Sequence, residues 1–193
     1  MRKLKLIMQM TLDGFVAGPN GENDWVFLPG KQDPAALQAT IDLAASADTL
    51  LGGRKLVQGG FAGYWEDVYN TQPDSIWHPF AKLMVEHRKI IFSRTGAEVT
   101  GTNIEVETRD LATVVNELKK QDGKDIIVYG GVEFASSLVE LDLVDEYVFI
   151  VNPIAIGSGL SIFKERKVMK LESSVAYTHG KVMNTYVPVK AEA

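Results

Sequence analysis

The chain has 193 residues, of which 46% are hydrophobic and 23% charged, and this fits a single globular domain spanning residues 1–193. A net charge of −5 argues against general binding to nucleic acids or membrane surfaces, because both require a basic face. The absence of cysteine excludes disulfides, thiolate catalysis and cysteine-ligated zinc. The N-terminus lacks the apolar core of a signal peptide, so we expect a cytoplasmic protein.

The first part of the chain predicts a strand, a long loop and a helix. Leu4, Leu6, Met8 and Met10 alternate with Lys5, Ile7 and Gln9, which indicates a strand with one fully apolar face. The stretch from Thr11 to about Lys31 carries four glycines, and loops of this length usually cover a binding site. Asp33 followed by Pro34 predicts the N-cap and the first residue of a helix.

In the middle of the chain, short apolar runs alternate with helical patterns. The predicted strands are residues 48–51, 89–92 and 103–107. The predicted helices are a short one after Lys55, residues 76–86, and residues 111–118, which Asp110 caps and Gly123 closes. We interpret residues 59–73, which are rich in glycine and aromatic residues, as a surface excursion.

The sequence from Asp125 to Pro153 predicts a strand–helix–strand unit. Ile126 to Tyr129 is an unbroken apolar run, as is typical of a strand covered on both faces. Gly130-Gly131 follows, and then a helix whose expected buried face carries Phe134, Leu138 and Leu141. Tyr147 to Val151 is the second strand, and Pro153 ends its ladder.

The C-terminal region predicts an antiparallel hairpin. Its strands are Leu171 to Tyr177 and Lys181 to Val189, with the turn at His179-Gly180. Together with the alternating strands and helices before it, this hairpin indicates an α/β fold. We expect a mixed, mainly parallel sheet flanked by helices, with an antiparallel edge.

Three predicted strands end in small or basic residues, which are Gly53-Arg54-Lys55, Ser93-Arg94-Thr95 and Gly130-Gly131. In an open α/β sheet, ligands bind outside the carboxyl ends of the strands, so these turns would share one edge. Cations at a helix N-terminus oppose the helix dipole unless an anion binds there. This arrangement favours a phosphate site over a set of solvated surface charges.

The usual dinucleotide fingerprint is absent. The chain has no G-x-G-x-x-G sequence, and Ile150 and Val151 stand where an acid would hold a ribose hydroxyl. Arginines without such an acid favour a 2′-phosphate, and therefore NADP over NAD.

Several motifs resemble the dihydrofolate reductase-like superfamily. They are TLDGFVAGPNGENDW, LLGGRK, IIFSRT and VYGGVEFASSLVELDLVDEYVFIVNPIAIGSGLSIF. The order and spacing of these motifs are similar to those of the C-terminal reductase domain of the bifunctional deaminase–reductase of riboflavin biosynthesis, including its short stand-alone bacterial members. The resemblance covers nearly the whole chain.

This resemblance implies a dihydrofolate reductase-like fold, an NADPH-dependent reductase and a homodimer. By similarity, Gly53, Arg54 and Lys55 would bind the cofactor phosphates, while Ser93 and Arg94 would face the adenosine ribose and its 2′-phosphate. The segment Gly130, Gly131 and Val132 would lie against the pyrophosphate and the nicotinamide. Val16, Ala17 and the loop to Trp25 would cover the nicotinamide.

Hydride transfer also requires a proton source and the exclusion of water. The candidate proton sources are Asp13, Asp24, Asp33 and an ordered water. We favour Asp24, beside Trp25, as the catalytic pair. Asp13 could instead shape the turn before Gly14, and Asp33 has a sufficient role as an N-cap, although dihydrofolate reductases carry a pterin-orienting acid near this point.

Other chemistries find less support in the sequence. The segment Gly157-Ser158-Gly159 does not form a nucleophile elbow, and no Walker loop is present. His78, His87 and His179 lie on separate elements without ligand spacing, so we interpret them as surface residues and predict no metal site.

The sequence therefore predicts an NADPH-dependent reductase of a small heterocyclic or carbonyl substrate, pterin- or pyrimidine-like. One alternative is a nucleotide-binding or ligand-sensing protein with the same fold and no catalysis. Another is a 5-amino-6-(5-phosphoribosylamino)uracil reductase of riboflavin biosynthesis.

Overall fold

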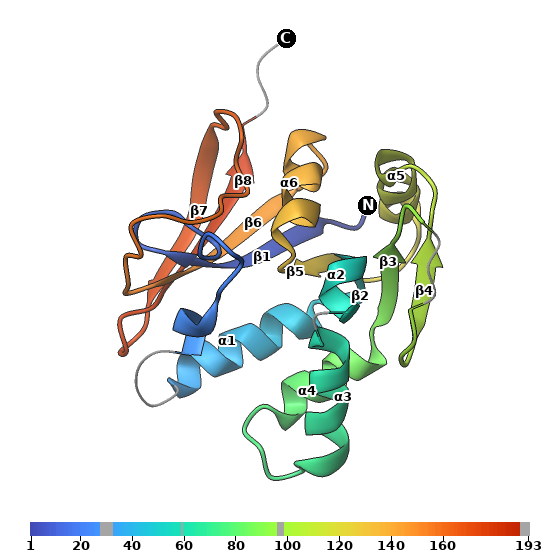
Figure 1. The fold of residues 1–193 in the computed structure, drawn as a ribbon, viewed down its shortest axis with the longest axis horizontal. Coiled ribbons are helices and arrows are strands. Elements are labelled where there is room, and N and C mark those ends of the chain that lie inside the picture. Colours follow the sequence, from blue (N-terminus) through green and yellow to red (C-terminus); the bar gives the residue numbers. More distant parts are fainter. Residues whose placement is uncertain (28–32, 59, 96–98, 190–193) are drawn as a thin grey trace.

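The fold is organised by eight strands that form one sheet. The strands are β1 (Leu4–Thr11), β2 (Ala47–Gly53), β3 (Arg88–Phe92), β4 (Ile104–Glu107), β5 (Asp125–Tyr129), β6 (Glu146–Asn152), β7 (Met169–Ala176) and β8 (Val182–Pro188). Their order in the sheet is β4-β3-β2-β5-β1-β6-β8-β7. The strands from β4 to β6 pair in parallel, and β8 and β7 join in antiparallel pairing, as the sequence predicts (Figure 1). The computed structural model describes residues 1–27, 33–58, 60–95 and 99–189.

Helices cover both faces of this sheet. They are the 3-10 helix η1 (Asp24–Phe27) and the α-helices α1 (Pro34–Ala45), α2 (Arg54–Gln58), α3 (Phe61–Thr71), α4 (His78–Glu86), α5 (Leu111–Lys120) and α6 (Val132–Glu140). In Figure 1, α1, α3 and α4 gather on one side of the sheet, and α5 and α6 lie on the other. Within the described part of the chain, no helix is both long and apolar enough to cross a membrane.

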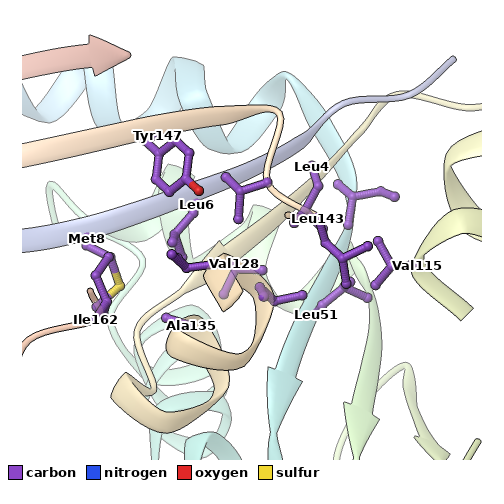
Figure 2. Packing of buried hydrophobic residues seen from close by; sticks show 14 of the residues in the cluster. Leu4, Leu6, Met8, Leu51, Val115, Val128, Ala135, Leu143, Tyr147 and Ile162 are labelled. Atoms are coloured by element: carbon purple, nitrogen blue, oxygen red, sulfur yellow. The ribbon is translucent and has the colours of Figure 1, made fainter. Parts of the chain in front are cut away.

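Strand alternation divides the apolar side chains between two cores. On the side of α5 and α6, Leu6, Met8 and Val128 pack with Ala135 of α6, and Figure 2 shows this cluster with Ile162 beside Met8. On the side of α1 and α4, the intervening residues Ile7, Leu50, Ile127 and Val148 pack with Phe80. Each large side chain buried in this way contributes about 1.5–3 kcal/mol. Strands buried on both faces carry apolar residues at consecutive positions, as in Ile126 to Val128.

The predicted N-caps agree with the structure, whereas α5 ends at the C-cap Gln121 and not at Gly123. The Asp33 carboxylate accepts hydrogen bonds from the backbone N–H groups of Ala35 and Ala36, so it is the N-cap of α1. The Asp110 carboxylate accepts one from the N–H of Thr113 and caps α5.

The interpretation of residues 59–73 as a surface excursion was wrong, because this region contains α3. Phe61 and Trp65 are one helical turn apart, and their rings contact each other with centroids 6.2 Å apart. Trp65 also meets Phe80 of α4 at 4.7 Å, and Phe61 stacks on Tyr129 at 6.4 Å. The aromatic residues are thus the packing face of a helix, and their spacing was the signal for it.

Two further expectations differ from the structure. Leu141 is 49% exposed, because α6 ends at Glu140 and Leu141 lies at its C-cap rather than on its buried face. His87 is buried rather than on the surface. Its imidazole lies 3.0 Å from the Ala44 carbonyl oxygen through Nε2 and contacts the Leu83 carbonyl through Nδ1, so it joins the C-terminal ends of α1 and α4.

Candidate functional site

The three predicted strand exits lie along one edge of the sheet. The strands β2, β3 and β5 are parallel neighbours, and Gly53 pairs with Phe92 at their carboxyl ends. The residues that follow, from Arg54, from Ser93 and from Gly130, therefore leave the sheet in the same direction. We call these three segments the strand-exit rim.

Phe134 on α6 packs this rim together. Its Cβ would lie 3.3 Å from a Cβ added at Gly53, so helix and strand approach each other closely where β2 ends. Its ring lies against the ring of Phe92, with centroids 5.5 Å apart. A side chain from the third strand exit thus touches the other two, and the arrangement of the rim is fixed by apolar packing.

Two glycines shape the start of α6. Gly130 and Gly131 have φ angles of +70° and +77°, which residues with side chains rarely adopt. A Cβ at Gly130 would meet no atom within 4 Å, so the backbone there is open to close approach. No side chain caps the N-terminus of α6, and its first N–H groups are available to an anion.

Cations and one acid surround this helix start. The Lys55 ammonium lies 2.9 Å from the Glu133 carboxylate, in a pair whose side chains are 77% and 80% exposed. Lys55 holds the pKa of Glu133 below its ordinary value, and Arg94 adds to this effect. Arg54 and Arg94 make no ion pair with the residues that the structure describes. Glu133 was not predicted as a site residue, although the sequence places it at the start of a predicted helix.

These features fit the phosphates of a dinucleotide cofactor. The rim offers an open glycine backbone, an uncapped helix N-terminus and the side chains of Arg54, Lys55 and Arg94 within one strip of the molecule. Ser93 lies on the same strip but is buried, with its N–H donating to the Glu107 carbonyl. It therefore contributes to the shape of the β3 exit.

The loop that follows β1 is fastened to the loop that follows β6. The Asp13 carboxylate accepts hydrogen bonds from the N–H groups of Ile156 and Gly157, at 3.0 and 2.7 Å, and from the Thr11 hydroxyl at 2.6 Å. These bonds, led by that of Thr11, lower the pKa of Asp13. Asp13 thus shapes the turn, and a carboxylate with a lowered pKa is a poor proton source.

An antiparallel bridge between Ala17 and Leu160 continues this connection. The Val16 N–H donates to the Leu160 carbonyl at 2.9 Å, and the Leu160 N–H donates to the Ala17 carbonyl at 2.8 Å. The side chains of Val16 and Ala17 are both buried. A Cβ at Gly159 would overlap the Ala17 carbonyl oxygen, which explains the glycine in this loop.

The predicted catalytic pair lies in η1. Trp25 is only 4% exposed, and its indole N–H is buried without a hydrogen-bond partner among the described residues. Asp24 is exposed at the start of the same 3-10 helix. The Val26 carbonyl accepts a hydrogen bond of 3.2 Å from the Lys181 ammonium, which ties η1 to the start of β8.

Asp33 joins α1 to the C-terminal hairpin. Besides capping α1, its carboxylate accepts hydrogen bonds from the Thr178 N–H at 2.8 Å and from the Thr178 hydroxyl at 2.6 Å. The hydroxyl is the main cause of its lowered pKa. All of these bonds hold structural elements together, which agrees with the N-cap role.

Polar side chains also gather on the α1 side of the sheet, near the carboxyl ends of β1, β5 and β6. The Asn152 amide donates to the Gln9 side-chain oxygen at 2.9 Å and to the Ile150 carbonyl at 3.1 Å. The Oδ1 atom of Asn152 and the hydroxyl of Tyr129 are buried without a partner among the described residues. Burial also raises the pKa of the Tyr129 hydroxyl.

Unsatisfied buried polar atoms are rare in folded proteins and often occur where a ligand binds. In the described part of the chain, the three side-chain atoms of this kind belong to Trp25, Tyr129 and Asn152. Tyr129 ends the rim strand β5, Asn152 ends β6 two positions along the sheet, and Trp25 precedes Val26, which Lys181 ties to the start of β8. Trp25 was predicted as a site residue from the sequence, whereas Gln9, Tyr129, Asn152 and Lys181 were not.

The sequence matches the RibD C-terminal domain family over residues 2–183. The chain belongs to this family. It is also 33% identical to the uncharacterized protein YyaP of Bacillus subtilis, in an alignment that covers 96% of this chain and 94% of YyaP.

Solved structures show the same fold at low sequence identity. RibD of Acinetobacter baumannii superimposes with a TM-score of 0.70 at 18% identity, over 98% of this chain and 58% of RibD. Dihydrofolate reductase of Enterococcus faecalis, solved with NADP(H), superimposes with a TM-score of 0.56 at 14% identity, over 97% of each chain. The predicted dihydrofolate reductase-like fold and the family resemblance are therefore confirmed.

A separate hollow between α5 and β4 lies away from these features. Its walls carry ion pairs of Arg88 with Glu105 and of Arg109 with Glu107 and Glu117. Since its charges are already paired, this hollow offers no unsatisfied group to a ligand. No cluster of three or more His, Asp or Glu residues able to hold a metal ion occurs in the described ranges.

Proposed function

We propose that this RibD C-terminal domain protein is an NADPH-dependent reductase that transfers a hydride to a small heterocyclic or carbonyl substrate. The observation that carries the proposal is the strand-exit rim. Phe134 packs three exits into one strip that combines an open glycine backbone, an uncapped helix N-terminus and three cationic side chains. This combination suits a pyrophosphate and a further phosphate.

Within the proposal, Gly53, Arg54 and Lys55 bind the cofactor phosphates, and Ser93 and Arg94 lie at the adenosine ribose and its 2′-phosphate. Gly130, Gly131 and Val132 border the pyrophosphate and the nicotinamide. When bound, the cofactor supplies a hydride from its nicotinamide ring.

Val16, Ala17 and the turn at Trp25 exclude water from the nicotinamide in this proposal. The bridge between Ala17 and Leu160 holds their backbone in place. Asp24 is the exposed acid of this turn and delivers the proton, directly or through water.

The test is a titration with NADPH and NADH, followed by thermal unfolding. A ligand at a hundredfold excess over its Kd stabilises the folded state by about 2.7 kcal/mol, which is easily measured. We expect NADPH to bind more tightly than NADH. The Arg94→Gln variant should lose most of this preference, since an arginine at the 2′-phosphate interacts only with NADPH.

Lys120→Gln is a suitable control, because Lys120 is an exposed cation on α5, away from the rim. It should leave both affinities unchanged. Equal affinity for the two cofactors in the wild-type protein would contradict the assignment of Arg54 and Arg94. Substrate-dependent oxidation of NADPH would then establish reductase activity.

One observation favours the alternative of a nucleotide-binding sensor without catalysis. Asp13 and Asp33, two of the predicted proton sources, hold loops and helices together through hydrogen bonds. If Asp24→Asn leaves every measurable turnover unchanged while NADPH still binds, Asp24 is not the proton source. A protein that binds NADPH but oxidises it with none of a panel of pterins, pyrimidines and carbonyl compounds would fit the sensor.

We also propose, from the family resemblance, that the protein is a homodimer. Light scattering coupled to gel filtration measures the molar mass directly. A mass of one chain across a wide concentration range would contradict this proposal.

A further inference from the structure

Lys181 occupies a position that the proposed cofactor site does not use. In the antiparallel β6–β8 ladder, Val151 pairs with Val182. The next pair of positions beyond it is Asn152 and Lys181, so these two residues lie side by side. Lys181 and Met183 are two residues apart, so their side chains lie on the same face of the sheet, and Met183 belongs to the core beneath α1. The Lys181 side chain therefore lies on the α1 side, and its ammonium reaches the Val26 carbonyl at 3.2 Å.

The charge of Lys181 is half-buried and lacks an acidic partner. Burial alone lowers the pKa of Lys181, and no carboxylate of the described residues opposes this effect. An ammonium group has three N–H donors, and the Val26 carbonyl accepts one of them. A cation that is partly removed from water without a counter-charge is costly unless an anion or a strong acceptor binds there.

The acid at the start of α1 does not supply this counter-charge. All the hydrogen bonds of Asp33 go to the first turn of α1 and to Thr178. Asn152 offers an acceptor, its buried Oδ1, and Gln9 beside it is uncharged. Beside Lys181 the β6–β8 register thus places an uncharged amide, Asn152, while the Asp13 carboxylate after β1 is already bonded to Thr11, Ile156 and Gly157.

We propose that Lys181 is a specificity-determining residue that binds a carbonyl or carboxylate oxygen of the substrate. The inference rests on the proposed function, because it places the substrate on the α1 side of the sheet, next to the Trp25 turn. The substrate class that we infer is a planar ring that is neutral or anionic and carries such an oxygen. A ring that binds as a cation is excluded, because it would meet an ammonium rather than a carboxylate.

The Trp25 turn supports this location. Its indole N–H is buried and unsatisfied in the described residues, and the next residue, Val26, is the one that Lys181 holds. A substrate oxygen at Lys181 would therefore lie next to the turn that contains Trp25. The turn and the start of β8, which the hydrogen bond between Lys181 and Val26 joins, would then both adjoin the same ligand atom.

The experiment uses orotate, an anionic oxo-pyrimidine, and 2,4-diaminopyrimidine, which binds proteins as a cation, with the full-length protein saturated with NADPH. Tryptophan fluorescence reports binding. The key variant is Lys181→Gln, which removes the charge but retains a donor for the Val26 carbonyl. Lys181→Arg keeps the charge, and Lys170→Met removes an exposed lysine from the neighbouring strand β7.

We expect the wild-type protein to bind orotate more tightly than 2,4-diaminopyrimidine. Lys181→Gln should weaken orotate binding at least tenfold, Lys181→Arg by less than threefold, and Lys170→Met not at all. Unfolding temperatures within a few degrees of the wild type would show that the fold is retained.

Three results would overturn the inference. They are tighter binding of 2,4-diaminopyrimidine than of orotate, unchanged orotate affinity in a folded Lys181→Gln variant, and binding of NADPH with neither pyrimidine bound. In each of these cases the protein still binds NADPH, so the proposed function is not contradicted. If NADPH itself fails to bind, the proposed function fails, and orotate binding without cofactor then decides on Lys181 alone.

Discussion

Phe134 and Phe92 place their rings 5.5 Å apart, and this contact joins the start of α6 to the end of β3. The side chain of Phe134 also lies against Gly53 at the end of β2. One side chain thus fixes the relative positions of three turns that come from distant parts of the sequence. The geometry of the proposed phosphate site depends on this packing, and the exposed pair of Lys55 and Glu133 adds a hydrogen bond between the exits of β2 and β5.

Replacement of Phe134 by alanine should therefore affect both stability and cofactor binding. Because the ring is partly buried, we expect a loss of about 2–3 kcal/mol in the free energy of unfolding. NADPH affinity should fall as well, since the three exits lose their common contact. Leu141→Ala, an exposed position just beyond the same helix, is the control and should change neither quantity. Weakened stability with unchanged NADPH affinity would contradict the role of Phe134 in the site.

The ion pair between Lys55 and Glu133 gives a second prediction, with an unusual sign. The Glu133 carboxylate pairs with the Lys55 ammonium and so lowers the positive electrostatic potential that a phosphate would meet there. Glu133→Gln should therefore tighten NADPH binding about 2–5-fold, as expected for the removal of one exposed charge near the ligand.

Glu140→Gln removes the same charge from the other end of α6 and is the matched control. It should leave the Kd for NADPH unchanged in isothermal titration calorimetry. Weaker NADPH binding by Glu133→Gln would instead show that this acid contacts the cofactor as an acceptor, for example for a ribose hydroxyl.

Gly159 and Gly63 provide a comparison of two glycines. A Cβ at Gly159 would overlap the Ala17 carbonyl oxygen and approach Phe15 Cβ to 2.9 Å, so Gly159→Ala should cost about 2 kcal/mol and disturb the bridge. A Cβ at Gly63 in α3 would meet no atom within 4 Å, so Gly63→Ala should stabilise the protein by about 0.5–1 kcal/mol. Urea unfolding measures both, and equal effects of the two substitutions would contradict the overlap.

Lys89 makes stability depend on pH in the alkaline range. It is buried, its ammonium donates to the carbonyls of Val85, His87 and Thr102, and burial lowers its pKa to about 8 from an ordinary value of 10.5. Between these values the unfolded chain binds more protons than the folded chain, so the free energy of unfolding rises with pH. From pH 7.5 to 9.5 the expected rise is about 2 kcal/mol.

Urea unfolding over this range tests the dependence, and Lys89→Met should flatten it. The range ends below pH 10 because burial raises the pKa values of Tyr129 and Tyr147. Because the folded chain holds these two tyrosine protons more tightly than the unfolded chain, the free energy of unfolding falls as the pH rises above about 10. A stability that is constant or falls between pH 7.5 and 9.5 would contradict the lowered pKa of Lys89.

Local patterns predicted most of the fold. The unbroken apolar run at Ile126 to Tyr129 predicted a strand covered on both faces, and Asp33 and Asp110 predicted helix starts. The region of α3 was missed, because its glycines and aromatic residues suggested a loop, whereas Phe61 and Trp65 owe their helical packing to partners on α4 and β5. Those partners are distant in sequence, and no local pattern indicates them.

The candidate site was predicted only in part, for the same reason. The glycines and cations of the strand exits were visible, since each follows directly from an apolar run. Lys181 and Asn152 were not, because each is an ordinary polar residue until the β6–β8 register sets them side by side. The pairing of Lys55 with Glu133 likewise depends on how closely α2 approaches α6.

The position of β1 between β5 and β6 also bears on how the chain is made. Leu4 pairs with Ile126 and Leu6 with Tyr147, so β1 leaves the ribosome well before both of its neighbours in the sheet. During that interval its apolar face lacks its native cover, and nascent chains that stop before Asn152 are expected to depend on chaperones.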